Sequence, residues 1–341
     1  MPTYVLEGGT SITLPAKPVT VRLHSQADPV RLTVLVDGSE IQAITPMPGH
    51  LVVPRVDAPT TIRVTPAGDG QRFGGGAVLN LMVGHDARSE LDPDRGVLNS
   101  LDVSGLTQRD ILLLEPEGSG EQSRIRVTVL GPAAAEAPLP PGASVARDAA
   151  RELLGTDHIQ ASTAVNAVVA VDVSASMLSA VADGTVAAAV EIVAGVHRVI
   201  GKPGDSLRAC LVGRRARWLP PAAPESLAAS LRQECADLDL VTGFRSAAAL
   251  SSPGGRADTI TWLITDGVPA DIDALAARDD VHLIMVVPNS ARDAVDGQGL
   301  SMTVIGLPEA AGQAPRFAGD PAVVREVVAS MLEPLRARLA A

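Results

Sequence analysis

The sequence predicts two domains, an all-β sandwich-like domain followed by an α/β domain with a doubly wound, mostly parallel sheet. The 341 residues are enough for about two domains at roughly 150 residues each. Residues 1–131 contain short alternating apolar runs separated by turn residues, whereas residues 145–341 alternate apolar strand patterns with helical ones. Between them, residues 132–144 (PAAAEAPLPPGAS) are rich in Pro and Ala, which predicts a linker.

The composition argues against several classes of protein. A hydrophobic content of 46% supports globular cores, but only 2% of residues are aromatic, which removes the usual stacking platforms for single-stranded nucleic acid. The net charge of −11 argues against a nucleic acid or an anionic membrane as partner. No secretory signal or spanning apolar run is visible, and Cys210 and Cys235 lack metal-ligand spacing. We therefore expect a soluble, cytoplasmic protein.

In the first domain, short apolar-alternating runs predict β-strands. Gly, Pro and Asp residues separate the runs at near-regular spacing, which is typical of a sandwich or jelly roll. The predicted strands span residues 11–14, 19–23, 31–36, 50–54, 60–65, 77–83, 110–114 and 124–130.

An acidic segment in this domain is a second place where a metal could bind. Residues 85–96 read HDARSELDPDRG, and clustered carboxylates before a glycine turn can hold Ca²⁺. Asp-Pro and Gly also favour a solvated turn between strands for local backbone reasons. Because no complete calcium-loop pattern is present, the turn is the preferred interpretation.

The second domain alternates strands and helices. Strands are predicted at residues 165–171, 206–213, 259–265, 281–287 and 301–306, with an antiparallel edge strand at 216–219 after a turn at Arg214-Arg215. Helices are predicted at residues 145–154, 185–200, 224–234, around 247–250, 272–277 and 321–339. Strands separated by helices favour a parallel, doubly wound sheet.

Oxygen-bearing side chains follow the apolar strands of this domain where those strands end. The run VVAV ends in DVSAS, the later strand ends in ITDG, and a loop between them carries a threonine. The carboxyl ends of parallel strands meet at one edge, where ligands bind. Oxygen ligands suit a hard cation such as Mg²⁺, with Mn²⁺ as a possible substitute. The expected metal-site residues are Asp172, Ser174, Ser176, Thr242 and Asp266.

The DVSAS stretch together with ITDG resembles the metal-ion-dependent adhesion site of von Willebrand factor A (vWA) domains. The resemblance covers about residues 166–307 and implies a Rossmann-like fold. It also implies that Mg²⁺ binds a protein partner that donates an acidic residue to the ion. Carried over by motif, the ligands are Asp172, Ser174, Ser176, Thr242 and Asp266.

The middle part of this pattern departs from the family. The threonine of the family usually follows two glycines and closely precedes an Ala-Leu pair. Here Val241 precedes Thr242, and Ala249-Leu250 lies further along the chain than usual. Ser246 is therefore an alternative source of the hydroxyl.

Three further segments resemble the bacterial vWA proteins encoded with tellurium-resistance and general stress genes. Two are ADGTV at residues 182–186 and TDGVPAD at residues 265–271. The third, LEGGTSITL at residues 6–14, resembles the start of a β-sandwich calcium-binding domain of the same system. The dense Asp/Glu motifs of that domain are not evident, so calcium binding by the first domain is not among our expectations.

We expect a non-enzymatic, Mg²⁺-dependent protein-binding or scaffold protein of a stress-response system. Three alternatives stay open: a vWA subunit that assists an ATPase complex, a metal-dependent hydrolase, and a scaffold with a vestigial metal site. The sequence has no nucleophile elbow, phosphate-binding loop or HExxH motif. Ser174 or Ser176 as a nucleophile would need a positioned base, and nothing in the sequence beyond their residue type points to His158, His197 or His282 in that role.

A local group of arginines lies at the predicted hairpin turn of the second domain. Basic side chains on an edge strand discourage pairing with other sheets, so a solvated edge is the expected interpretation. The residues are Arg214, Arg215 and Arg217.

Overall fold

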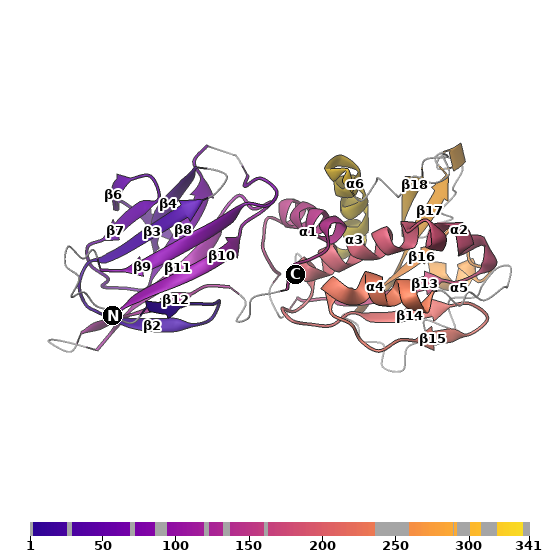
Figure 1. Cartoon of the computed structure of the whole chain (residues 1–341), viewed down its shortest axis with the longest axis horizontal. Coiled ribbons are helices and arrows are strands. Elements are labelled where there is room, and N and C mark those ends of the chain that lie inside the picture. Colours follow the sequence, from indigo (N-terminus) through magenta and orange to yellow (C-terminus); the bar gives the residue numbers. More distant parts are fainter. Residues whose placement is uncertain are drawn as a thin grey trace. The chain divides into compact units, whose positions relative to one another are not determined.

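The computed structural model describes residues 3–25, 29–68, 72–85, 94–118, 123–131, 137–159, 163–235, 259–288, 290–291, 301–307 and 319–336. It divides the chain into two compact units, Met1–Glu136 and Ala137–Ala341. The protein is a mixed α/β structure with antiparallel and mostly parallel sheets, which confirms the predicted fold class at this level (Figure 1). Each unit is described by itself.

The described strands of the first unit form two six-stranded sheets. All pairs are antiparallel except β1 with β10. In spatial order, one sheet contains β1 (Thr3–Val5), β10 (Arg95–Asp102), β9 (Val78–Gly84), β3 (Val19–Ser25), β7 (His50–Val53) and β6 (Ile44–Met47). The other contains β2 (Ser11–Pro15), β12 (Arg124–Val129), β11 (Arg109–Glu117), β8 (Thr60–Pro66), β4 (Val30–Val36) and β5 (Ser39–Ile41).

One apolar core serves both of these sheets. Leu14 and Ile62 of one sheet belong to the same buried cluster as Val21 and Leu79 of the other, and all four are fully buried. Alternation along β8, in which every second residue is buried, produces this one-sided burial. The alternating runs of the sequence therefore mark the residues that face the core.

The sequence prediction missed four strands of the first unit. β1, β5 and β6 are three or four residues long and bury no side chain, so no alternation marks them. β10 has a register shift between Leu98 and Leu101, and Ser100 there has a φ of 58°. A bulge breaks the period of two, which hides the strand from pattern analysis.

The second unit contains a six-stranded sheet that is parallel except at one edge. The β14–β15 pair is antiparallel and the other four pairs are parallel. This confirms both the mostly parallel sheet and the antiparallel edge strand. In spatial order the strands are β15 (Ala216–Trp218), β14 (Arg208–Val212), β13 (Asn166–Asp172), β16 (Thr259–Thr265), β17 (Val281–Pro288) and β18 (Met302–Leu307).

Both faces of this sheet are buried. Val171 and Trp262 face a cluster that contains residues of five helices, while Ala170 and Leu263 face a second cluster with Leu275 of α5 (Ile272–Ala276). Burial on both faces explains why these strands are continuously apolar. The five helices of the first cluster are α1 (Pro141–Leu154), α2 (Leu178–Ala182), α3 (Thr185–Ile200), α4 (Pro224–Glu234) and α6 (Pro321–Leu332).

Two helix bounds differ from the prediction. α1 begins at Pro141 and not at residue 145, because proline fits the first turn and Ala143 is fully buried. The end of the predicted linker is therefore helical. α6 ends at Leu332 and not at residue 339, and a 3₁₀ turn, Glu333–Leu335, follows it. Pro334 in that turn cannot donate a backbone hydrogen bond, which stops an α-helix.

Close backbone packing joins α1 to α3 at Gly195. A Cβ atom at this position would lie 2.8 Å from the Cβ of Ala146 and would also collide with the carbonyl oxygen of Ala143. Glycine is therefore required for α1 to approach α3 this closely.

No single helix in the described ranges is long and apolar enough to cross a membrane. One helix pair, Ala175–Ala182 with Thr185–Ile200, passes the length and composition test together but is bent by 75°.

Candidate functional site

The predicted site lies where the strand order of the second sheet reverses. From β13 the chain passes to β14 on one side, and after β15 it crosses to β16 on the other side of β13. Ligands bind outside the carboxyl ends of strands at such a switch point. Asp172 is the last residue of β13, and Asp266 directly follows β16.

Four of the five predicted residues form one chain of polar contacts. The backbone N–H of Ser174 donates to Oδ1 of Asp172 at 2.8 Å. The hydroxyls of Ser174 and Ser176 are 3.0 Å apart, and Ser176 donates to Oδ1 of Asp266 at 2.9 Å. Asp172, Ser174 and Ser176 thus lie in one chain of contacts, which ends at Asp266, the residue that follows the neighbouring strand.

The fifth predicted residue, Thr242, lies outside the described residues. The same holds for its alternative, Ser246, and for the helix predicted around residues 247–250.

Thr265 is a site residue that the sequence analysis missed. Its Oγ1 lies 2.9 Å from Oδ2 of Asp172 and 2.9 Å from the carbonyl oxygen of Gly267, and it accepts the Gly267 N–H at 3.1 Å. The side chain is fully buried. A buried hydroxyl at the end of an apolar strand must find polar partners, so its position was the available signal.

No basic side chain in the described part of the chain balances the charge of this site. Asp172 is 1% exposed, and burial is the main cause that raises the pKa of its carboxyl. Hydrogen bonds from Ser174 and Thr265 lower that pKa, and the nearby Asp266 carboxylate raises it. Among the described side chains, no Lys, Arg or His forms an ion pair with Asp172 or Asp266. Buried charges are normally paired or bound to a metal.

The donor set fits a hard cation. Asp172, Ser174, Ser176 and Asp266 offer oxygen atoms of the kind that Mg²⁺ prefers. Ser176 is exposed and Asp266 is partly exposed, so an ion could reach the site. The described residues contain no group of three or more His, Cys, Asp or Glu that could hold a metal. Among the described residues, the oxygen donors gathered here are therefore two carboxylates and two serine hydroxyls.

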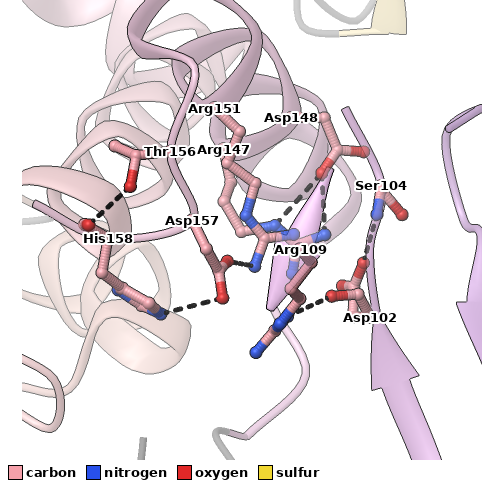
Figure 2. Close-up of polar contacts among 9 residues, drawn as sticks. All are labelled: Asp102, Ser104, Arg109, Arg147, Asp148, Arg151, Thr156, Asp157 and His158. Carbon is pink, nitrogen blue, oxygen red and sulfur yellow. Dashed lines mark hydrogen bonds and ion pairs between the residues drawn. The ribbon is translucent and has the colours of Figure 1, made fainter. Parts of the chain in front are cut away.

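His158 belongs to a polar cluster near the end of α1. Its Nε2 is 3.8 Å from Oδ2 of Asp157, and Asp157 also forms an ion pair with Arg151 (Figure 2). Thr156 donates to the carbonyl oxygen of His158 at 2.7 Å. This histidine thus makes its polar contacts with its own segment and not with the serines of the candidate site.

The other two candidate bases are buried neutral rings. Burial lowers the pKa of His197 to about 4, and its ring nitrogens have no hydrogen-bond partner among the described residues. Burial also lowers the pKa of His282 to about 4, and its ring nitrogens contact Ser301 and Thr303. No described histidine contacts Ser174 or Ser176, so the described part of the chain offers no histidine base for a serine nucleophile.

Most of the acidic segment of the first unit lies outside the described residues. Positions 86–93 belong to this undescribed part, while Nδ1 of His85 is 2.9 Å from the carbonyl oxygen of Pro18. The calcium interpretation thus stays untested.

No protein-family model matches the chain, and no curated protein matches it either.

Proposed function

We propose that the second unit is a vWA-like domain that binds Mg²⁺ and uses the ion to bind an acidic residue of a protein partner. The supporting observation is the pair of carboxylates, Asp172 and Asp266, at the strand-order switch without a basic side chain in the described residues. We further propose a Rossmann-like fold for this unit and a β-sandwich-like first unit. The whole protein would act as a non-enzymatic, cytoplasmic scaffold in a tellurium-resistance-like stress response.

The chain's own residues would have distinct roles at the ion. Ser174 and Ser176 would offer neutral hydroxyl oxygens, while Asp172 and Asp266 would supply negative charge directly or through water. Thr265 would hold Asp172 in place through its hydroxyl. Thr242 or Ser246 would add a further hydroxyl.

A bound ion would supply an electrophilic centre for an incoming carboxylate. Few of the proposed ligands are charged, so the ion would keep positive character toward the partner. Mg²⁺ also retains several water ligands, which a partner oxygen can replace. A carboxylate from the partner would then complete the charge balance that the described residues leave open.

Calorimetric titration of Mg²⁺ and Mn²⁺ into the chelator-treated full chain tests this proposal. We expect saturable binding in the wild type and a loss of more than about 100-fold in Asp172→Asn, because a charged ligand of the ion is removed. Asp183→Asn is the matched control, since Asp183 is an exposed aspartate of the same segment whose Oδ1 accepts the Thr185 N–H.

Equal metal binding by the wild type and Asp172→Asn would contradict the proposed site. Absence of binding in all three proteins would instead favour the scaffold with a vestigial site. Turnover of a generic phosphoester by the loaded wild type would favour the hydrolase, and we expect none.

A further inference from the structure

Exposed apolar side chains of the second unit are concentrated at the candidate site. Among the described residues of this unit, two large apolar side chains are exposed, Leu178 at 58% and Val268 at 49%. Leu178 is two residues from Ser176 and Val268 is two residues from Asp266. Ser176 donates to Asp266 at 2.9 Å, so each apolar residue is two positions along the chain from one partner of this hydrogen bond.

Segments around the site reinforce this placement. Leu178 begins α2 (Leu178–Ala182), and Val268 lies in the loop that leads to α5. Within the second unit, α2 and α5 lie at the same end of the sheet (Figure 1). An exposed apolar surface beside a polar site is characteristic of a protein-binding surface.

A basic turn borders the site on its other side. Val212, the last residue of β14, is in register with Asp172, and its carbonyl oxygen accepts the Val173 N–H at 3.0 Å. The next residues lead into the turn at Arg214 and Arg215, both of which are exposed. In a chain with a net charge of −11, the exposed Arg215 places positive charge beside the site, which is complementary to an acidic group of a partner.

We propose that this surface binds an extended segment of another protein that carries an apolar residue next to its ion-binding carboxylate and a second acidic residue beyond it. The carboxylate would bind the ion, the apolar side chain would cover Leu178 and Val268, and the second acid would pair with Arg215. This inference rests on the proposed metal site. It adds that two surface features select the partner sequence: the apolar rim, which we define as Leu178 and Val268, and the basic turn at Arg214 and Arg215.

The test is selection from a random peptide library displayed on phage, with capture in Mg²⁺ and elution with EDTA. We expect EDTA-eluted peptides to share an Asp or Glu with a large apolar residue within two positions and another acid nearby. Synthetic versions of the enriched peptides then serve as probes for affinity measurements on variants of the full chain.

The variants separate the rim from the ion. The double substitution Leu178→Ser with Val268→Ser is expected to weaken peptide binding by about tenfold while Mg²⁺ affinity stays unchanged. The matched control replaces two equally exposed apolar residues of the first unit, Ile44→Ser with Met47→Ser, which are 55% and 60% exposed. Arg215→Glu is expected to weaken peptides that carry the second acid, and Arg232→Glu on α4 is its control.

Four outcomes would overturn the inference, and the last of them would also refute the proposed metal site. Enrichment of acidic peptides without an apolar neighbour, or unchanged affinity in the Leu178→Ser with Val268→Ser variant, would refute the rim alone. Failure to enrich any EDTA-eluted peptide, with normal Mg²⁺ binding, would also refute it. Failure of Mg²⁺ binding itself would refute the proposed function on which it depends.

Discussion

The sheet of the second unit carries two partly buried, hydroxyl-rich clusters at opposite ends, and they differ in charge. The aspartate cluster lies at the carboxyl ends of β13 and β16 and comprises Asp172, Ser174, Ser176, Thr265 and Asp266. The histidine cluster lies at the amino ends of β17 and β18 and comprises His282, Ser301, Thr303 and Ser330. Both contain short hydrogen bonds between residues far apart in the sequence.

The histidine cluster is neutral and closed. Ser330 donates to the carbonyl oxygen of Met302 at 3.3 Å, and Thr303 donates to Ser330 at 2.8 Å. The oxygen of Thr303 is then left to accept from Nε2 of His282, and Nδ1 accepts from Ser301. Each hydroxyl or ring N–H of this cluster therefore donates to an acceptor within the protein.

The aspartate cluster differs in its charge. Its side chains also form hydrogen bonds, but no described basic side chain compensates the negative charge of its carboxylates. Two carboxylates share one hydroxyl chain, and their mutual repulsion adds to the burial that raises the pKa of Asp172. The comparison teaches that hydrogen-bond satisfaction alone does not reveal a ligand site. The charge balance distinguishes a cluster that stabilises the fold from the one that we propose binds a cation.

Acidification should act with opposite signs on the two buried histidines, His197 of α3 and His282 of the histidine cluster, and on the aspartate cluster, and its effect on the histidines is the largest we expect. His197 and His282 have folded pKa values of about 4, below the usual 6.5, so the folded state binds fewer protons than the unfolded state between these values. Stability is therefore lost as the pH falls below about 6.5. At pH 5 the loss is about 2 kcal/mol for each histidine, or about 4 kcal/mol for both.

Urea unfolding in chelator at pH 7 and pH 5 measures this loss. His197→Phe keeps an aromatic ring but cannot titrate, so the loss should fall by about half. The raised pKa of Asp172 works in the other direction, since protonation of the folded form becomes easier as the pH falls. An equal loss in His197→Phe and the wild type would show that buried histidines do not cause it.

Saturating Mg²⁺ should stabilise only through the aspartate cluster. At a free ion concentration of 100 times Kd, the expected gain is about 2.7 kcal/mol in the free energy of unfolding. Asp172→Asn should show no gain, whereas His282→Phe should start from a lower stability and show the full gain. Thermal and urea unfolding with and without the ion measure both effects, and a gain in Asp172→Asn would point to an ion site elsewhere.

Two matched threonine substitutions separate structure from metal binding. Thr265→Val and Thr303→Val each remove one buried hydroxyl and leave its partners unsatisfied, so each should destabilise by about 1–3 kcal/mol. Only Thr265→Val should also weaken Mg²⁺ binding, by about 10–100-fold, because Thr265 holds Asp172. Calorimetry that finds the same metal affinity for both variants would exclude this role for Thr265.

The smallest effect concerns stability without metal. In EDTA, Asp172→Asn should be at least as stable as the wild type, because it removes the repulsion from Asp266. The amide oxygen would still accept from Ser174, and the Thr265 hydroxyl would donate to Gly267. Asp172→Ala lacks the acceptor and should be less stable. Urea midpoints in EDTA measure the difference, and a large loss in Asp172→Asn would assign the carboxylate a structural role.

Much of the candidate site was predictable because its signals are local. Asp172 and Asp266 follow apolar runs that read as buried strands, and residues after such runs lie at the sheet edge. The position of Thr265 was visible, but its hydrogen bond was not, because its partner Asp172 lies 93 residues away. The local sequence does not distinguish a buried threonine that only packs in the core from one that hydrogen-bonds to a carboxylate.

The sequence by itself determined the elements that are buried on a regular period. The helix α3 and the strands β13 and β16 match their predicted positions within a residue, because burial imposes an apolar pattern on the chain. The tertiary structure alone decided the short exposed strands β5 and β6, the start of α1 and the pairing of polar groups across strands. These depend on contacts between distant segments, which leave no period in the sequence.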